Sequence, residues 1–268
     1  MDVLSRNHET VTGRGSRAMI FAHGFGCDQR MWRLVAPAFA QDYRVVQFDH
    51  VGSGRSAPSA YDPSKYASLK GGATDVLELC AELDLRDAVF VGHSCSAMIG
   101  VLAANREPAR FSHLVLVCPS PRYINDDGYI GGFTRPGVDE LLGILEANHV
   151  GWAEAMAPTI MGHPDRPELG QELEASFCST DPAIARQFAR VTFLSDNRTD
   201  LSRVTTPALI LQCTDDVIAP LAVGAYCEQH IRGSTLVVMR ATGHCPHLSA
   251  PEETIAAMEA FLAAHAVA

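Results

Sequence analysis

The sequence predicts an α/β fold in which a mostly parallel central sheet is flanked by helices. Short apolar runs rich in Val, Ile and Leu alternate with helix-compatible stretches, and such runs are typical of parallel strands buried on both faces. We expect strands at 18–22, 44–48, 88–92, 114–118, 208–213 and 236–239. We expect helices at 64–83, 97–105, 219–231 and 251–264. This alternation makes the sheet the middle of three layers.

The last of these helices has a start signal of its own. Ser249 and Glu252 have the spacing of a capping box. Pro251 lies between them, in the first turn, where proline is well tolerated. We therefore expect the helix to begin at this point.

A helical cap is predicted at about 135–194, where the alternation lapses and no convincing strand is found. Its apolar residues exceed what one crossover helix must bury. Some of them could roof a cavity at the strand ends; the alternative is that they only pack the cap onto the body. These residues are Leu141, Leu142, Leu145, Trp152, Met156, Ile160, Phe177, Phe188 and Phe193.

Length and composition indicate one domain. A chain of 268 residues with 47% hydrophobic content can bury one large core, and nothing in it resembles a linker. We expect a single domain over 1–268, with its core at 1–134 and 195–268 and its cap at 135–194.

The charge argues against several partners. The formal net charge is −10, whereas nucleic acid or an anionic membrane surface is bound by a basic patch. The first residues lack the apolar core of a signal peptide, and no apolar run reaches the roughly 20 residues that span a bilayer. We expect a cytoplasmic protein that binds neither nucleic acid nor membrane.

The eight cysteines are scattered and form no C-x-x-C pair, so we expect reduced thiols. Cys95 follows Ser94 at the start of a predicted helix, a place where the pKa of a thiol can be lowered. We nevertheless expect Cys95 to be a small filler, because the serine already occupies the turn.

The most informative motif is Gly92-His93-Ser94-Cys95-Ser96, where a predicted strand turns into a helix. A serine on such a sharp turn is held above the sheet, an arrangement called a nucleophile elbow. The usual motif has glycine where this chain has Ser96, although serine is still small enough for close helix–strand packing. A serine attacks a carbonyl only with a histidine base and an orienting carboxylate.

Both partners follow later strands. Asp215 and Asp216 come after the strand at 208–213, and His244 lies in the loop after the strand at 236–239. The order serine, acid, histidine is that of α/β-hydrolases, and the ends of parallel strands bring such residues to one edge of the sheet. Taken alone, the two aspartates could belong to a turn or a helix cap, and His244 could be an ordinary loop histidine. Together they predict a catalytic triad.

The triad predicts acyl transfer. His244 would take the proton of Ser94 and return it to the leaving group, while the aspartate orients the imidazole. The backbone N–H groups of Phe25, after the strand at 18–22, and of Cys95 would form the oxyanion hole. We also expect the Phe25 side chain at the pocket entrance.

We expect no metal and no cofactor. His244, Cys245 and His247 lie close together in the sequence, but Pro246 stiffens the run and no second cluster completes a zinc site. Other histidines follow or end apolar strands, where backbone groups can satisfy an imidazole, and we expect them to be structural. They are His23, His50 and His93.

Eight segments, spread over nearly the whole chain, point to one group of hydrolases. They are LSRNH at 4–8, GFGCDQ at 24–29, FDHVGSG at 48–54, VGHS at 91–94, PSPRYIND at 119–126, FCSTDP at 177–182, LQCTDD at 211–216 and GHCPH at 243–247. On these segments the chain resembles the α/β-hydrolases related to RsbQ, a bacterial energy-stress regulator, and to the plant karrikin and strigolactone receptors. The segments at 119–126 and 177–182 discriminate best, because generic hydrolases do not share them.

The resemblance implies a triad of Ser94, Asp216 and His244, and so selects Asp216 over Asp215. It implies a four-helix cap over a compact apolar pocket. The lining that it implies is Phe25, Tyr123, Phe133, Phe193 and Ile218. In that family hydrolysis is slow and serves signalling: the bacterial member acts with a phosphatase that bears a PAS sensor domain, and the plant receptors cleave butenolide ligands.

Our leading hypothesis is a serine hydrolase that cleaves the ester or lactone of a small apolar compound through an acyl-enzyme on Ser94, in stress or ligand signalling. The alternative is a ligand- or partner-binding regulator, with a PAS-domain type of phosphatase as its partner, in which hydrolysis is slow or incidental. A third hypothesis is a dehalogenase-like, C–C-bond or perhydrolase activity. Dehalogenation is disfavoured, because it needs a carboxylate nucleophile at the elbow.

Overall fold

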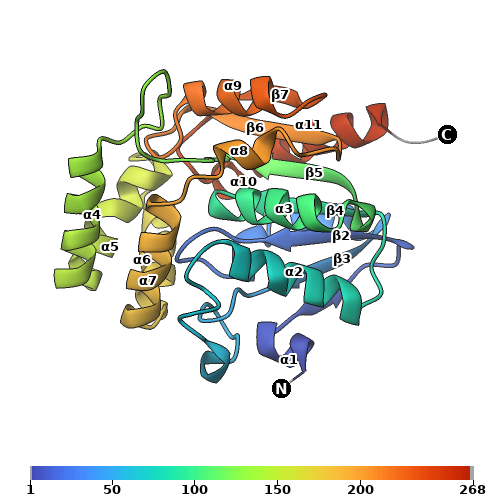
Figure 1. The fold of residues 1–268 in the computed structure, drawn as a ribbon, viewed down its shortest axis with the longest axis horizontal. Helices are drawn as coiled ribbons and strands as arrows, with labels where there is room; N and C mark the ends of the chain where they lie inside the picture. The colour runs from blue at the N-terminus through green and yellow to red at the C-terminus, as the bar shows by residue number, and fades with distance from the viewer. Residues whose placement is uncertain (1, 266–268) are drawn as a thin grey trace.

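The computed structural model describes residues 2–265 and has a seven-stranded sheet at its centre (Figure 1). The strands are β1 (Thr10–Thr12), β2 (Arg17–Ala22), β3 (Tyr43–Phe48), β4 (Ala88–His93), β5 (Phe111–Val117), β6 (Ala208–Asp215) and β7 (Thr235–Thr242). They lie in the order β1-β3-β2-β4-β5-β6-β7. β1 pairs with β3 in the antiparallel direction, and the other neighbouring pairs are parallel. The mostly parallel sheet and all six expected strands are confirmed.

Helices cover both faces of the sheet. They are α1 (Val3–Asn7), α2 (Lys70–Glu82), α3 (Cys95–Arg106), α4 (Arg135–Ala147), α5 (His149–Met161), α6 (Pro167–Ser179), α7 (Pro182–Phe193), α8 (Arg198–Leu201), α9 (Leu221–His230), α10 (Pro246–Ser249) and α11 (Pro251–Ala264), with 3-10 helices η1 (Gln29–Trp32), η2 (Ala36–Phe39), η3 (Pro58–Ala60) and η4 (Pro108–Arg110). Ile20 of β2 packs with α2, α3 and α9, whereas its neighbour Phe21 packs with η1, η2 and α11. Because side chains alternate along a strand, the two faces build two separate cores.

The expected cap consists of α4 to α7. In Figure 1 these four helices stand together at one end of the sheet, on the side to which the β5 arrow points. Their apolar faces form a third core, which includes Leu145 and Trp152 and also Tyr123 and Cys245 from loops of the body. The cap is therefore packed directly onto the loops at the carboxyl ends of the strands.

Three details differ from the sequence prediction. β1 was not predicted, because all three of its residues are exposed and give no apolar signal. α2 begins at Lys70 rather than at residue 64, since the preceding residues form turns that start with a hydrogen bond from the Ser64 N–H to Asp62 Oδ1 (2.8 Å). α11 begins at Pro251 as predicted, but the capping box is wrong, because Ser249 belongs to α10 and the N-cap residue is Ala250.

All eight cysteines are free, as predicted. Cys95 is fully buried, and this burial raises the pKa of its thiol to about 11. The thiol is therefore protonated near neutral pH, as expected for a filler. No helix within residues 2–265 combines the length and the apolar character needed to cross a bilayer.

Candidate active site

Three side chains form a hydrogen-bonded row beyond the carboxyl ends of β4, β6 and β7. Ser94 Oγ lies 2.8 Å from His244 Nε2, and His244 Nδ1 lies 2.7 Å from Asp216 Oδ2. The second carboxylate oxygen, Asp216 Oδ1, accepts hydrogen bonds from the backbone N–H groups of Ile218 (2.8 Å) and Ala219 (3.0 Å). The structure thus brings together Ser94, Asp216 and His244, all buried, whereas Asp215 is exposed.

The turn that carries Ser94 is strained. Ser94 has φ 58° and ψ −123°, a conformation that costs a residue with a Cβ about 1–3 kcal/mol. The turn is tight enough that a Cβ on Gly92 would lie 2.5 Å from the Ser96 carbonyl oxygen. The backbone N–H of Ser94 is held by the carbonyl of Val117 at the end of β5 (2.8 Å). Gly92 and β5 therefore fix the serine above the sheet.

Ser96, which breaks the usual elbow motif, takes part in a buried polar cluster. Its hydroxyl donates to the carbonyl of His23, and its oxygen lies 2.7 Å from His50 Nε2, which donates to it. His23 in turn accepts the backbone N–H of His50 on Nε2 (3.1 Å) and pairs through Nδ1 with the Gly24 carbonyl (2.9 Å). Burial lowers the pKa of both imidazoles. His23 and His50 are structural, as expected, and Ser96 is their partner.

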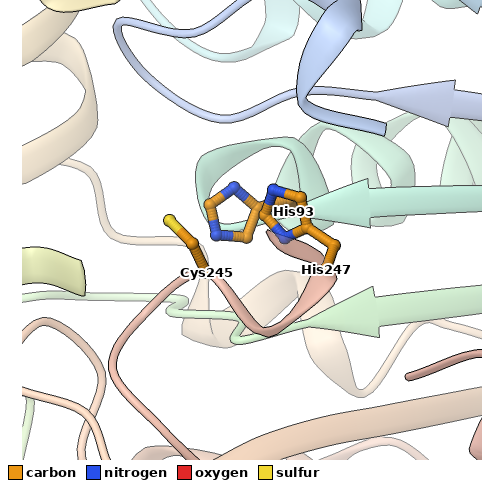
Figure 2. A group of neighbouring side chains, drawn as sticks. All are labelled: His93, Cys245 and His247. Atoms are coloured by element: carbon orange, nitrogen blue, oxygen red, sulfur yellow. The ribbon is translucent and has the colours of Figure 1, made fainter. Parts of the chain in front are cut away.

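His93 also has a structural contact. Its Nε2 lies 2.8 Å from the carbonyl oxygen of His244 and so supports the loop that carries this residue. His93, Cys245 and His247 have ligand-type atoms within 4.8 Å of one another. In Figure 2 the sulfur of Cys245 and the ring of His247 lie on opposite sides of the His93 ring. Burial raises the pKa of the Cys245 thiol well above its usual range, so without a metal ion the sulfur is protonated. That no metal is bound remains a prediction.

His247 provides a pH-dependent contribution to stability. It is buried against Trp32, and this burial lowers the pKa of its imidazole from 6.5 to about 3. Below about pH 6.5 the unfolded chain therefore binds a proton that the folded protein does not, so the free energy of unfolding falls as the pH drops toward 3, by up to about 1.4 kcal/mol per pH unit. We expect His247→Phe to show a shallower fall in urea titrations below pH 6.5. Equal slopes for both proteins would contradict this assignment.

An apolar cavity opens at Ser94. Its empty volume is about 420 Å³, and its lining includes no Lys, Arg, Asp or Glu. The lining residues are Phe25, Cys27, His93, Ser94, Tyr123, Trp152, Ile160, Leu173, Phe177, Thr192, Phe193, Ile218, His244 and Cys245. Four of the five expected lining residues are present. Phe133 is absent from this set; its ring makes an edge contact with Phe193, with the ring centroids 6.0 Å apart.

The cap supplies a large part of this lining. The cap residues that line the cavity are Trp152, Ile160, Phe177 and Phe193. These four residues therefore do more than pack the cap onto the body. The leucines of α4, in contrast, pack inside the cap core. Leu173 and Thr192 also line the cavity and were not predicted. The helical periodicity of α6 could have indicated Leu173, whereas a threonine gives no apolar signal.

Tyr123 brings a polar group close to Ser94. Its side chain is buried, and its hydroxyl lies 3.4 Å from Ser94 Oγ. Burial raises the pKa of the phenol, which therefore remains a hydrogen-bond donor. Phe25, in the loop after β2, lines the same cavity, and its ring contacts Trp152 with the ring centroids 6.0 Å apart.

The cap also holds the loop of His244. The backbone N–H of His244 donates to the carbonyl of Ile160 in α5 (2.8 Å). Beside it, Gly243 has φ +76°, and a Cβ at this position would overlap the Met161 carbonyl oxygen. The end of α5 and the histidine loop therefore fit together only without a side chain at Gly243.

We expect Gly243→Ala to displace His244 from Ser94. The predicted result is a loss of activity of at least about tenfold, together with a destabilisation of roughly 1–3 kcal/mol from overpacking. Gly233→Ala is the matched control, since Gly233 has a similar φ of +72° but open space around it. Kinetics and urea unfolding of both variants test this, and equal effects of the two substitutions would show that backbone strain alone is responsible.

Comparison with known proteins shows the family to which this fold belongs. The model of the alpha/beta hydrolase family matches residues 19–257, and the chain belongs to this family. Similar proteins include Karrikin insensitive 2 receptor IA of Petunia hybrida (39% identical over 91% of this chain and 90% of that protein) and Strigolactone esterase D14 of Arabidopsis thaliana (37% identical over 94% of each). A solved hydrolase from Oleispira antarctica is 40% identical, with a TM-score of 0.95 over 98% of this chain and 96% of its own. The expected relation to the plant receptors is confirmed.

Proposed function

We propose that the protein is a serine hydrolase that cleaves the ester or lactone of a small apolar compound through an acyl-enzyme on Ser94. The observation that carries this proposal is the hydrogen-bonded row of Ser94, His244 and Asp216 at an uncharged cavity. A role in ligand or stress signalling and a cytoplasmic location, both expected from the sequence, are part of the proposal.

The geometry fits a two-step mechanism. As Ser94 Oγ attacks the carbonyl carbon, His244 Nε2 accepts the serine proton, and the Asp216 carboxylate stabilises the imidazolium. When the tetrahedral intermediate collapses, His244 gives this proton to the leaving oxygen, which leaves an ester on Ser94. Water then attacks this ester with His244 as the base and frees the acid.

Two backbone groups are proposed as oxyanion donors, those of Phe25 and Cys95. Cys95 is the first residue of α3, so its N–H has no partner within the helix and the positive end of the helix dipole lies beside Ser94. Each such donor contributes about 2.7–4 kcal/mol to transition-state stabilisation.

The uncharged lining predicts the substrate class. We expect p-nitrophenyl butyrate to be cleaved with a kcat/KM at least about tenfold above that of p-nitrophenyl hemisuccinate. The succinyl group of the hemisuccinate would place an unpaired carboxylate in an apolar cavity. A brief burst of p-nitrophenol with an acyl adduct in the intact mass should accompany turnover. Equal rates for the two esters, or turnover without an adduct, would overturn the proposal.

A second candidate is a regulator that binds a ligand or a protein partner and for which hydrolysis is slow or incidental. It is supported by the relatives named as receptors. The RsbQ-like part of the resemblance points to a phosphatase of the PAS-domain type as the partner. Complementation of a deletion strain separates the candidates: if Ser94→Ala restores signalling as well as the wild type does, catalysis is dispensable, and if it does not, the hydrolase proposal stands.

A further inference from the structure

A second cavity lies beside the Ser94 cavity and shares no lining residue with it. Its empty volume is about 390 Å³, and it lies between α7 of the cap, the loop after β3, and helices α2 and α3 of the body. Its walls include Tyr61, Tyr66, Leu69, Ile99, Phe188 and Val191. Much of its lining is thus aromatic or aliphatic, and the proposed function does not use it.

Phe188 separates the two cavities. Its ring makes an edge contact with Phe25, which lines the Ser94 cavity (centroids 5.6 Å apart), and another with His50, which lines the second cavity (6.0 Å). Further along α7, Val191 faces the second cavity, whereas Thr192 faces the first. One cap helix therefore forms a wall of both.

The outer wall is held in place by hydrogen bonds. Gln187 Nε2, on α7, donates to the Pro63 carbonyl oxygen (2.8 Å), which ties the helix to the loop that carries the two tyrosines. The rings of Tyr61 and Tyr66 are stacked, with centroids 5.1 Å apart and an interplanar angle of 23°. The cavity thus offers a preformed, flat aromatic surface.

The Tyr61 hydroxyl is a buried hydrogen-bond donor in this wall that has no acceptor within residues 2–265. The Tyr66 hydroxyl, in contrast, donates to Asp75 Oδ2 (2.8 Å). The charge of Asp75 is matched by Lys65 (2.6 Å) and Arg6 (3.0 Å). A buried hydroxyl without a partner is unfavourable, so a ligand that accepts its hydrogen bond gains affinity.

We propose that this second cavity binds a neutral, planar, largely apolar molecule whose carbonyl oxygen accepts a hydrogen bond from Tyr61. An anion would find no free cation here, since Lys65 and Arg6 are paired with Asp75, and a cation would find a carboxylate that is already paired. The flat aromatic surface selects for a ring. The site is separate from Ser94, so the proposal does not depend on the proposed hydrolysis.

The test uses acetophenone brominated on the ring, a neutral planar ketone with no ester bond to hydrolyse. Affinity is measured by calorimetry, and the anomalous signal of bromine locates the molecule in soaked crystals. We expect a bromine peak between Phe188 and the tyrosines. Tyr61→Phe should weaken binding about two- to tenfold, the range for one neutral hydrogen bond. Val191→Phe, which fills the cavity, should weaken it at least about tenfold.

Two control variants distinguish this site from the Ser94 cavity. Leu173→Phe fills only the Ser94 cavity, and Arg190→Ala changes an exposed residue of α7, so both should keep the site. Circular dichroism verifies the fold of each variant. If Val191→Phe does not fold, Tyr61→Phe still tests the site, because it keeps the stacked ring and removes only the hydroxyl. A bromine peak confined to the Ser94 cavity, no binding, or equal affinity in Tyr61→Phe and wild type would overturn the proposal. Failure of the hydrolase proposal would instead appear at Ser94, which this ligand does not test.

Discussion

Ser94→Ala is expected to lower the kcat for p-nitrophenyl butyrate by about 10⁴-fold or more. The substitution removes the nucleophile that forms the proposed acyl-enzyme, and loss of the serine of a triad eliminates nearly all catalysis by the triad. The Ser94 hydroxyl oxygen lies 2.8 Å from His244 Nε2 and 3.4 Å from the Tyr123 hydroxyl, and both contacts are lost. Its removal costs little in packing, so the variant should fold and still bind substrate with a similar KM.

Ser53→Ala is the matched control for this loss. Ser53 is also a buried serine, and its hydroxyl has no hydrogen-bond partner within residues 2–265. Ser53 lies in the loop after β3, outside the Ser94 cavity. The rate of ester hydrolysis by Ser53→Ala should therefore stay within about twofold of that of the wild type. Ester turnover that survives in Ser94→Ala would place the nucleophile elsewhere.

Asp216→Asn is expected to lower kcat by about 10⁴-fold, the order of effect of losing the orienting carboxylate. Oδ1 is fixed by the N–H groups of Ile218 and Ala219, so the amide nitrogen takes the place of Oδ2 and meets His244 Nδ1 with a donor. The imidazole then carries its proton on Nε2 and cannot accept the proton of Ser94.

Asp215→Asn makes the same chemical change at the neighbouring residue. Its side chain is exposed, and the contact of residue 215 to the histidine loop is made by its backbone carbonyl, which accepts the Gly243 N–H (2.6 Å). We expect an activity within about twofold of wild type. Equal losses in the two variants would contradict the assignment of Asp216, and rate measurements at several substrate concentrations decide between the outcomes.

The strands were predictable because β2, β4 and β5 are buried on both faces and leave continuous apolar runs in the sequence. The order of Ser94, Asp216 and His244 was readable because each follows an apolar run. Ser94 and Asp216 follow the buried strands β4 and β6, and His244 follows β7, which is only partly buried. The choice of Asp216 over Asp215 came from the resemblance rather than from spacing. The structure shows the physical difference between them: one carboxylate is buried against two backbone N–H groups, and the other is exposed.

Contacts between distant segments were not predictable from local pattern. Ser96 departs from the elbow motif, and only the fold shows that His23 and His50 supply its partners. Phe133 gives the same aromatic signal as Phe193, yet it contacts the Phe193 ring and is not part of the cavity lining. The second cavity depends on how α7 packs against the loop after β3, which no periodicity of either segment indicates.

The central claim is that Ser94 is a nucleophile activated by His244. Its most direct test is treatment of the wild type, Ser94→Ala and His244→Ala with a fluorophosphonate, followed by intact mass measurement. The account predicts one adduct on the wild type, none on Ser94→Ala, and labelling of His244→Ala slowed by at least about a thousandfold, since the serine then lacks its base. A folded wild type that remains unlabelled, or a Ser94→Ala variant that gains the same adduct, would contradict it.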